Sequence, residues 1–501
     1  MIIEVSPAPA GSTDADLLAV PFFEGPAGPE PGPGAAEAAR VIGADLAGLL
    51  AQQGFGGRPG DAATFLVPGG GPRRVVAVGA GPAGEAGTSA VRDAAQRVAA
   101  LAAGSVHVAA TLGLLGRDRA ASVRAAAEGF LLGSYQVPRA GSQPVAGPRP
   151  APPETLTLLA GEAGRGRVPG DLRDALARGT VTGQMASWVR DLVHAPAGAA
   201  TPEMLAETIA AQAAEHGAAA RIWTAGELAR AGFGGVVGVG QGSRNPPRLV
   251  EVTHDGPGGP PWAFAGKGIT FDSGGLNLKR DPGEISWMRS DMAGGAAVAA
   301  AVIAAARLAL PVPAVAVVPL AENMPGGGAL RPGDVLTHRG GRTSEVVDTD
   351  SEGRLVVADA LGYLAERSPA ALIDVATLTD AAGLGPALWA AMGTDQELMA
   401  GVLRAGEAAG EPGWQLPLPG AYRGLLSSAA ADLRNTPAHG PDSTVMAAMF
   451  LREFAAGIPW VHIDNGSTAW LEHGTGLWPE GATGSPARAL LRFLEARAAG
   501  R

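Results

Sequence analysis

Apolar and polar positions in the first third of the chain alternate between short strand-like and longer helix-like patterns. Short apolar runs at 74–78 and 106–110 predict buried strands, and alanine-rich segments at 89–103 and 119–132 predict helices. Another short apolar run at 156–159 predicts one more strand. Strands that alternate with helices in this way are typical of an α/β domain.

A stretch rich in proline and glycine, from Pro138 to Pro153, interrupts this alternation. It cannot hold a helix and has little to bury, so we expect an exposed excursion near the end of a first domain. The pattern at 171–192 then predicts a long connecting helix, and Thr201-Pro202 predicts the start of another, with a hydroxyl cap before a proline at the first helical position. We therefore expect an α/β fold of two domains, a smaller one at 1–165 and a larger one at 166–501.

The longest apolar stretch runs from Gly294 to Leu320 and is dominated by alanine. Arg307, Pro311 and Pro313 divide it. This pattern predicts a buried helix followed by a strand and is too interrupted for a membrane span.

Composition excludes several classes of site. The chain has no cysteine, which rules out disulfides, thiolate zinc sites and cysteine nucleophiles. Its formal net charge of −10, without a basic run, argues against wrapping nucleic acid or binding an anionic membrane surface. The N-terminus lacks the basic start and apolar core of a signal peptide, so we expect a cytoplasmic protein.

A glycine pattern at Gly79, Gly81 and Gly84 has the spacing of a dinucleotide-binding turn. Pro82 lies inside it, and no second strand ending in an acidic residue follows at the required distance. We interpret the segment as a plain glycine-rich loop and expect no nucleotide cofactor.

Lysine usage points to one part of the chain. Only two of the 38 basic residues are lysines, Lys267 and Lys279, and both lie in a glycine-rich segment with Asp272. A buried lysine amine can lose its proton and become a neutral donor, which arginine does not do. A buried lysine–aspartate pair that merely holds a loop is the structural alternative.

A second segment concentrates carboxylates. In an extended conformation Asp348, Asp350, Glu352 and Arg354 would share one face. Repulsion among the three carboxylates would call for cations beyond the single Arg354. Asp291 precedes the alanine-rich helix. Together with Asp272, and without any pair of histidines at ligand spacing, these acids predict a carboxylate-rich site for two divalent metal ions.

Three motifs extend this interpretation to a known family. They are Lys267-Gly-x-Thr-Phe-Asp272-Ser-Gly-Gly-x-x-x-Lys279, Met288-x-x-Asp291-Met and Thr349-Asp350-x-Glu352-Gly-Arg354-Leu. Together they resemble the leucyl (cytosol) aminopeptidase family of two-metal peptidases. The resemblance covers about residue 168 to the C-terminus and implies a catalytic domain with a central mixed sheet flanked by helices, preceded by a macro-like α/β domain.

The resemblance also implies residue roles. Lys267, Asp272, Asp291 and Glu352 would hold the more labile of two divalent ions, Mn²⁺ or Zn²⁺, and Asp272, Asp350 and Glu352 the tighter one. A metal-bridging water would attack the scissile carbonyl of a peptide with a free N-terminus, removing leucine and other residues. Lys279 would stabilise the oxyanion, and Arg354 would hold a bicarbonate ion as general base. For the substrate pocket we expect Met288, Thr377 and Asp380.

Departures from the family pattern leave the substrate open. This chain has Asp348, Ser351, Asp380 and His194 where the family usually has Asn, Ala, Gly and Asn. A specialised dipeptidase for Cys-Gly or a small peptide conjugate is therefore an alternative, and a DNA-binding or scaffold protein is a weaker one. The resemblance implies a homo-hexamer that acts in intracellular peptide turnover. Among the histidines, we expect His462 to be buried and hydrogen-bonded.

Overall fold

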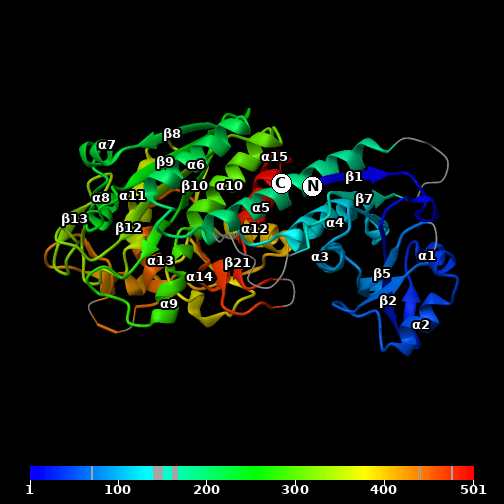
Figure 1. Cartoon of the computed structure of the whole chain (residues 1–501). Helices are drawn as coiled ribbons and strands as arrows, with labels where there is room; N and C mark the ends of the chain where they lie inside the picture. The colour runs from blue at the N-terminus through cyan, green and yellow to red at the C-terminus, as the bar shows by residue number, and fades with distance from the viewer. Residues whose placement is uncertain are drawn as a thin grey trace. The chain divides into compact units, whose positions relative to one another are not determined.

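A computed structural model describes residues 1–68, 71–138, 150–160, 168–437, 439–440, 442–475 and 478–500. Its contacts divide the chain into two units, Met1–Ser187 and Trp188–Arg501 (Figure 1). Most of the expected proline-rich excursion lies outside the described residues. The domain boundary after residue 165 stays a prediction.

The first unit is built around a seven-stranded sheet. Its strand order is β1 (Ile2–Ser6), β7 (Thr155–Leu159), β6 (His107–Ala110), β2 (Leu17–Gly25), β5 (Arg74–Pro82) and β4 (Ala62–Leu66), with β3 (Gly28–Pro31) on β2. The pairs β2–β3 and β4–β5 are antiparallel, and the others are parallel. The α-helices are α1 (Ala35–Ile42), α2 (Leu46–Gln52), α3 (Thr88–Leu101), α4 (Arg119–Ser134) and the larger part of α5 (Gly170–His194).

Helices cover both faces of this sheet because its central strands are apolar on both sides. Leu17 and Ala19 of β2 pack in one core with α3 and α4, whereas Leu18 and Val20 pack in another with α1 and α2. The predicted strands and helices of this unit are confirmed to within a few residues. Strand β5 continues to Pro82, so the expected glycine-rich loop begins later than predicted, because this part of β5 pairs with β2.

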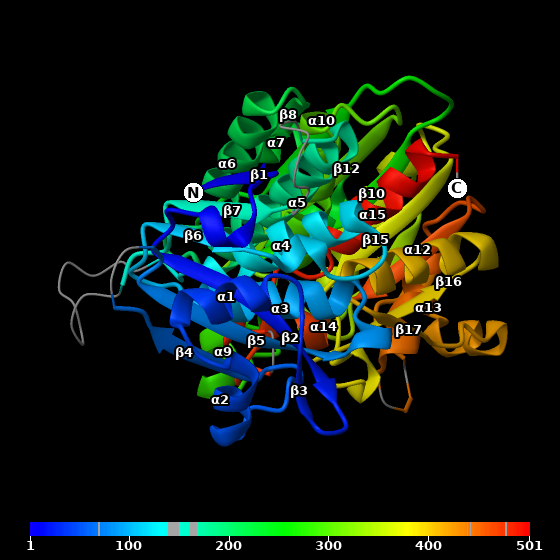
Figure 2. The same cartoon turned by 90° about the vertical axis from the view of Figure 1, so that its right-hand side faces the viewer.

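The second unit contains a nine-stranded mixed sheet. Its order is β17 (Gly413–Gln415), β16 (Trp389–Gly393), β19 (Trp460–Asp464), β15 (Ala371–Ala376), β10 (Trp262–Gly266), β12 (Ala314–Asn323), β9 (Arg248–His254) and β8 (Ala219–Trp223), with β11 (Gly268–Asp272) on β12. The central strands β19, β15, β10 and β12 are parallel, and β11 pairs with β12 in the same sense. Figure 2 shows β12, β10 and β15 side by side.

Two small sheets and ten further α-helices also belong to the described part of this unit. The strands are β13 (Val335–Thr337), β14 (Thr343–Glu345), β18 (Leu433–Arg434), β20 (Trp470–Leu471) and β21 (Gly481–Ala482). The helices are α6 (Pro202–Glu215), α7 (Ala225–Arg230), α8 (Gly234–Gly240), α9 (Pro282–Trp287), α10 (Ala293–Arg307), α11 (Gly353–Ala365), α12 (Gln396–Ala409), α13 (Thr444–Arg452), α14 (Gly466–Ala469) and α15 (Ala487–Ala498).

The central strands are sandwiched between helices. Ala263 and Ala265 of β10 belong to a core shared with α8, α11 and α13, whereas Phe264 is buried on the opposite side of the strand. Helix α10 lies against β10 and β15 and is buried from Ala293 to Ala305. The prediction that the long apolar stretch forms a buried helix followed by a strand is therefore confirmed by α10 and β12. None of the helices described is long and apolar enough to cross a membrane.

Candidate metal centre and active site

The predicted metal-binding side chains lie at one edge of the larger sheet. Lys267 directly follows β10, and Thr377 directly follows β15. Asp272 ends β11, Asn323 ends β12, and the two residues are paired in register. Parallel strands bring their carboxyl ends to the same edge, where ligands bind in open α/β sheets. Polar residues that follow apolar strands therefore meet here.

A tight loop after β11 returns Lys279 to this edge. Gly274 and Gly275 have φ values of +87° and +65°, in the left-handed region that glycine adopts without strain. The Lys279 N–H donates to the Ser273 carbonyl at 2.9 Å, and Thr349 Oγ1 donates to the Gly274 carbonyl at 2.7 Å. The loop thereby places the Lys279 amine 3.0 Å from Asp272 Oδ2.

The acidic segment is not extended, so the predicted common face is wrong. The Asp350 N–H donates to Asp348 Oδ1 at 2.9 Å, which closes a turn, and α11 begins at Gly353. Asp350 and Glu352 still reach the edge of the sheet. Asp348 closes the turn, and Arg354 lies inside the helix. The hydrogen bond from the Asp350 backbone to the Asp348 side chain favours a turn over the extended conformation that the alternating charges suggested.

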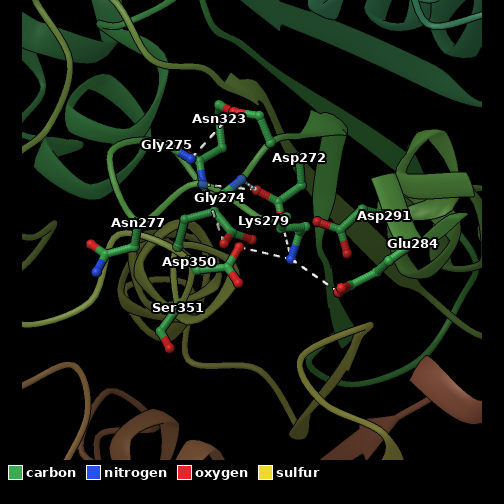
Figure 3. A network of polar contacts seen from close by, with 12 residues as sticks. Asp272, Gly274, Gly275, Asn277, Lys279, Glu284, Asp291, Asn323, Asp350 and Ser351 are labelled. Atoms are coloured by element: carbon green, nitrogen blue, oxygen red, sulfur yellow. Dashed lines mark hydrogen bonds and ion pairs between the residues drawn. The ribbon is translucent and has the colours of Figure 1, made fainter. Parts of the chain in front are cut away.

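Three carboxylates form the centre of the site. Asp272, Asp350 and Glu352 each offer an oxygen within 4.8 Å of the others, and Asp272 and Glu352 are almost fully buried. Asn323 Nδ2 donates to Asp272 Oδ1 at 2.8 Å and orients it. Figure 3 shows Asp272, Asp350 and Lys279 pointing toward one another, with Asp291 nearby and Ser351 turned away. Buried carboxylates at this spacing need positive charge to be stable.

Two lysine amines supply that charge in this structure. Lys267 Nζ lies 2.8 Å from both Asp291 Oδ2 and Glu352 Oε1, and Lys279 Nζ lies 2.7 Å from Asp350 Oδ1. These three oxygens are buried, and the lysine amines are their charged partners. Buried carboxylate oxygens that converge in this way fit divalent cations such as Mn²⁺, which carboxylates bind readily.

The electrostatics of the cluster are set by burial and by mutual charge. Burial raises the pKa of Asp350 to about 7, with Asp272 adding repulsion and Lys279 opposing it. Burial also raises the pKa values of Asp291 and Glu352. For Lys267, burial acts to lower the pKa, but the charges of Asp291, Glu352 and Asp272 outweigh it and raise the pKa. The site is thus short of positive charge before any metal binds.

A cavity of about 830 Å³ opens onto this cluster. Lys267, Asp272, Asp291, Asp350 and Lys279 all line it. The three predicted pocket residues line it too, namely Met288, Thr377 and Asp380. Its volume suits a small peptide, and its wall combines charged groups with apolar residues such as Leu378 and Trp470.

Two predicted site residues, Glu352 and Arg354, are absent from the described lining of the cavity, and of these Arg354 lies inside helix α11, where it is buried. Its terminal nitrogens contact the carboxylate of Asp442, at 2.6 Å and 3.2 Å. His462, as predicted, is buried, and its Nδ1 lies 2.6 Å from Asp374 Oδ1.

Asn323 shapes the site although it was not predicted as a site residue, and the predicted pocket residue Thr377 makes a further contact there. Asn323 orients Asp272 and also donates to the Thr349 carbonyl at 2.9 Å. Thr377 was assigned only to the pocket, but its Oγ1 donates to Asp291 Oδ1 at 2.7 Å. Both residues stand at the ends of buried apolar strands, and this position was the one signal that could have revealed them.

Comparison with known proteins places this geometry in a family. The profile described as "Cytosol aminopeptidase family, catalytic domain" matches residues 187–491, and the profile of the family's N-terminal domain matches residues 19–144. The chain belongs to the cytosol aminopeptidase family. The resemblance inferred from the motifs is confirmed, as is the two-domain α/β fold.

Individual relatives agree with the family match. A probable cytosol aminopeptidase of Streptomyces coelicolor is 38% identical, with 99% of each chain covered, and one of Syntrophotalea carbinolica is 40% identical, over 90% of this chain and 92% of the relative. The solved structure of the bottromycin maturation enzyme BotP in complex with Mn is 36% identical, with a TM-score of 0.84 over 97% of this chain and all of that one. A mutant of tomato leucine aminopeptidase is 27% identical, with a TM-score of 0.85 over 99% and 96%.

Membership fixes the general activity. Cytosol aminopeptidases are dinuclear metal enzymes that remove N-terminal residues from peptides, and this protein is a metallo-aminopeptidase of that type. The enzyme class inferred from the sequence is therefore confirmed.

Proposed function

We propose that the protein removes unblocked N-terminal residues, leucine among them, from short peptides, using two divalent ions held by Lys267, Asp272, Asp291, Asp350 and Glu352. The observation that carries this proposal is the convergence of buried carboxylates beside a peptide-sized cavity. Asp272 and Glu352 would be shared by both ions, because each lies near members of both proposed ligand sets. When bound, the ions activate a water molecule and polarise the scissile carbonyl.

The chain's own groups have distinct tasks in this proposal. Lys267 would bind an ion as a neutral amine. Its acidic neighbours raise its pKa and favour the charged form, so the positive charge of the metal would have to outweigh them. Lys279 would remain an ammonium group and stabilise the oxyanion, because it lines the cavity and faces Asp272 and Asp350. Thr377 would keep Asp291 in place through its hydrogen bond.

The family resemblance implies a bicarbonate ion held by Arg354 as general base, but the contacts of this arginine do not favour that role. Its buried Nε has no hydrogen-bond partner among the described residues, whereas its two terminal nitrogens bind Asp442. An anion at the terminal nitrogens would have to displace that carboxylate.

Mn²⁺ and Zn²⁺ are the proposed metals. The similar BotP was solved with Mn, which supports Mn²⁺ here. Carboxylate-rich sites with one amine accept either ion, so the availability of each metal would decide which one occupies the sites. The first substrate residue would contact Met288, Thr377 and Asp380, which line the cavity.

A single-compound peptidase is the second candidate. The similarity to a bottromycin maturation enzyme supports a dedicated substrate, and Asp380 places a carboxylate in the cavity wall. Comparing kcat/KM on Cys-Gly, on leucine amide and on a peptide library separates a dedicated peptidase from a general one.

We propose that the protein acts as a homo-hexamer in the cytoplasm. The relatives are named cytosol aminopeptidases, which supports the compartment. Light scattering on the purified protein tests the hexamer. A DNA-binding role would require a salt-dependent mobility shift, which the net charge of −10 disfavours.

The proposed activity is tested with purified protein loaded with Mn²⁺ or Zn²⁺. We expect hydrolysis of amino-acid amides and dipeptides, and no hydrolysis of the same substrates with an acetylated N-terminus. Failure on the whole panel with either metal would refute the proposed function.

A further inference from the structure

Arg354 and Asp442 form a two-point ion pair between separate elements. Arg354 is the second residue of α11 and is 1% exposed. Its Nη2 donates to Asp442 Oδ2 at 2.6 Å, and its Nη1 donates to Asp442 Oδ1 at 3.2 Å and to the Asn435 carbonyl at 2.6 Å. The planar fork of the guanidinium thus already binds a carboxylate in the bidentate geometry that arginine uses for anions.

Asp442 is held in this position by further donors. The Ser443 N–H donates to Oδ1 at 3.0 Å, and Ser351 Oγ donates to Oδ2 at 3.3 Å. Ser443 is the N-cap of α13, so Asp442 lies directly before a helix N-terminus, where negative charge is favoured. Both carboxylate oxygens therefore have two donors each, one from Arg354 and one from a serine.

These contacts do not fit a free anion on Arg354. The terminal nitrogens are occupied, and the remaining Nε is buried, with no hydrogen-bond partner in the described chain. An anion reaching Nε would lie roughly 6–7 Å from the Asp442 carboxylate, and one unit charge at that distance weakens binding on the order of 100-fold at an effective dielectric of about 20.

We propose that Asp442 is a positioning residue that replaces a free anion as the partner of Arg354, so that this enzyme neither binds bicarbonate at Arg354 nor needs it for activity. The expected effect of bicarbonate on the hydrolysis rate rests on the proposed function. The expected lack of bicarbonate binding at Arg354 does not depend on activity. Asp442 and Ser351 would act together, since the hydroxyl that Ser351 adds contacts the same carboxylate.

The test compares the full-length, metal-loaded enzyme with Asp442→Asn, which keeps the size of the side chain and removes its charge. Binding of ¹³C-labelled bicarbonate in CO₂-free buffer is followed by NMR with Zn²⁺ as the metal. We expect the wild type to show no bicarbonate binding that is lost on replacing Arg354. Asp442→Asn should gain a saturable site, with affinity on the order of 100-fold higher, that is lost again when Arg354→Gln is added.

Activity gives a second measurement. The wild type should hydrolyse leucine amide at the same rate with and without bicarbonate, whereas Asp442→Asn should be slower without it and be restored by it. Glu366→Gln is the matched control, because Arg339 binds Glu366 through two hydrogen bonds of 2.7 Å at the other end of α11, about 20 Å from Glu352. This control should behave as the wild type.

Two results would overturn the inference. One is wild-type bicarbonate binding or stimulation that disappears with Arg354→Gln. The other is a folded Asp442→Asn enzyme that gains neither binding nor bicarbonate dependence. If the wild type is inactive on every substrate, the proposed function fails, while the binding measurement still decides the role of Asp442.

Discussion

Lys267 Nζ lies 2.8 Å from Glu352 Oε1, although the two residues are separated by 85 positions and come from different elements. Lys267 follows β10, and Glu352 is the N-cap of α11. The contact joins the carboxyl edge of the sheet to the helix that covers it. Several predictions about metal binding depend on it and on its neighbours.

Replacing Lys267 by arginine should remove metal and activity together. Lys267 is 4% exposed, and a guanidinium is larger and does not become neutral. We expect activity to fall at least on the order of 100-fold, since even the loss of an outer-shell partner costs about 10- to 100-fold. Metal content measured by mass spectrometry, together with hydrolysis of leucine amide, checks this.

Gly353→Ala tests the same contact from the helix side. A Cβ at this position would lie 2.5 Å from Lys267 Cε and 2.6 Å from its Nζ, so the lysine must move. Metal loss in both variants supports ligation by the amine. Full metal content and full activity in Lys267→Arg would refute the ligand assignment.

Lys279→Met should separate metal binding from catalysis. The substitution keeps most of the volume but removes the ammonium that faces Asp272 and Asp350. Metal content should be unchanged or higher, because a competing positive charge is gone. The rate constant kcat should fall on the order of 100- to 1,000-fold, as for the loss of one oxyanion donor. An unchanged kcat would exclude Lys279 from the transition state.

Gly274→Ala should impair the active site beyond its effect on stability. A Cβ there would lie 2.5 Å from the Asn277 carbonyl oxygen and 2.9 Å from Asp350 Oδ1, at a φ of +87°. Moving Asp350 by about 1 Å is enough for a 100-fold loss of activity. Gly333→Ala is the control, because Gly333 also has a positive φ (+94°) but nothing within 4 Å of its Cβ position.

Both glycine variants should lose about 1–2 kcal/mol of stability from left-handed strain. Thermal unfolding measures that shared cost, and kinetics measures the difference. Equal activity in the two variants would show that the loop after β11 tolerates movement of Asp350.

His194 should make the enzyme sensitive to mild acid. Burial, followed by the charges of Arg289 and Arg190, lowers the pKa of His194 to about 4. Between this value and the pKa of about 6.5 in the unfolded chain, only the unfolded state binds the proton, so stability falls as pH drops through this window. The slope is at most about 1.4 kcal/mol per pH unit, and partial exposure reduces it.

His194→Asn removes this titration. His194 Nε2 accepts a hydrogen bond from the Ala482 N–H at 3.1 Å, and an asparagine carbonyl can accept the same bond. Melting temperatures at pH 7 and pH 5 should therefore differ less in the variant than in the wild type. An equal difference in both proteins would contradict the assignment.

Asp380→Asn should change the preference for the first substrate residue. Asp380 is exposed in the cavity wall, so its charge is screened and we expect an effect below about tenfold. The ratio of kcat/KM for lysine amide to that for glutamate amide should fall. An unchanged ratio would place the first side chain away from Asp380.

Residue types and their periodicity determined much of this protein. The apolar patterns at 89–103 and 171–192 and in the stretch after Gly294 were sufficient to predict α3, α5, α10 and β12, because a helix or strand must bury one face whatever its neighbours are. Two isolated lysines and a set of acids beside glycines were sufficient to name the family and to propose the metal ligands.

Tertiary structure decided how those residues are used. Asp348 closes a turn, which changed the expected strand-like face of the acidic segment. Asn323 and Thr377 became part of the site only when β12 and β15 were aligned with β10. The pairing of Arg354 with Asp442 joins positions 88 residues apart. Contacts of this kind depend on strand register and on which helix ends meet, and local sequence pattern carries no record of either.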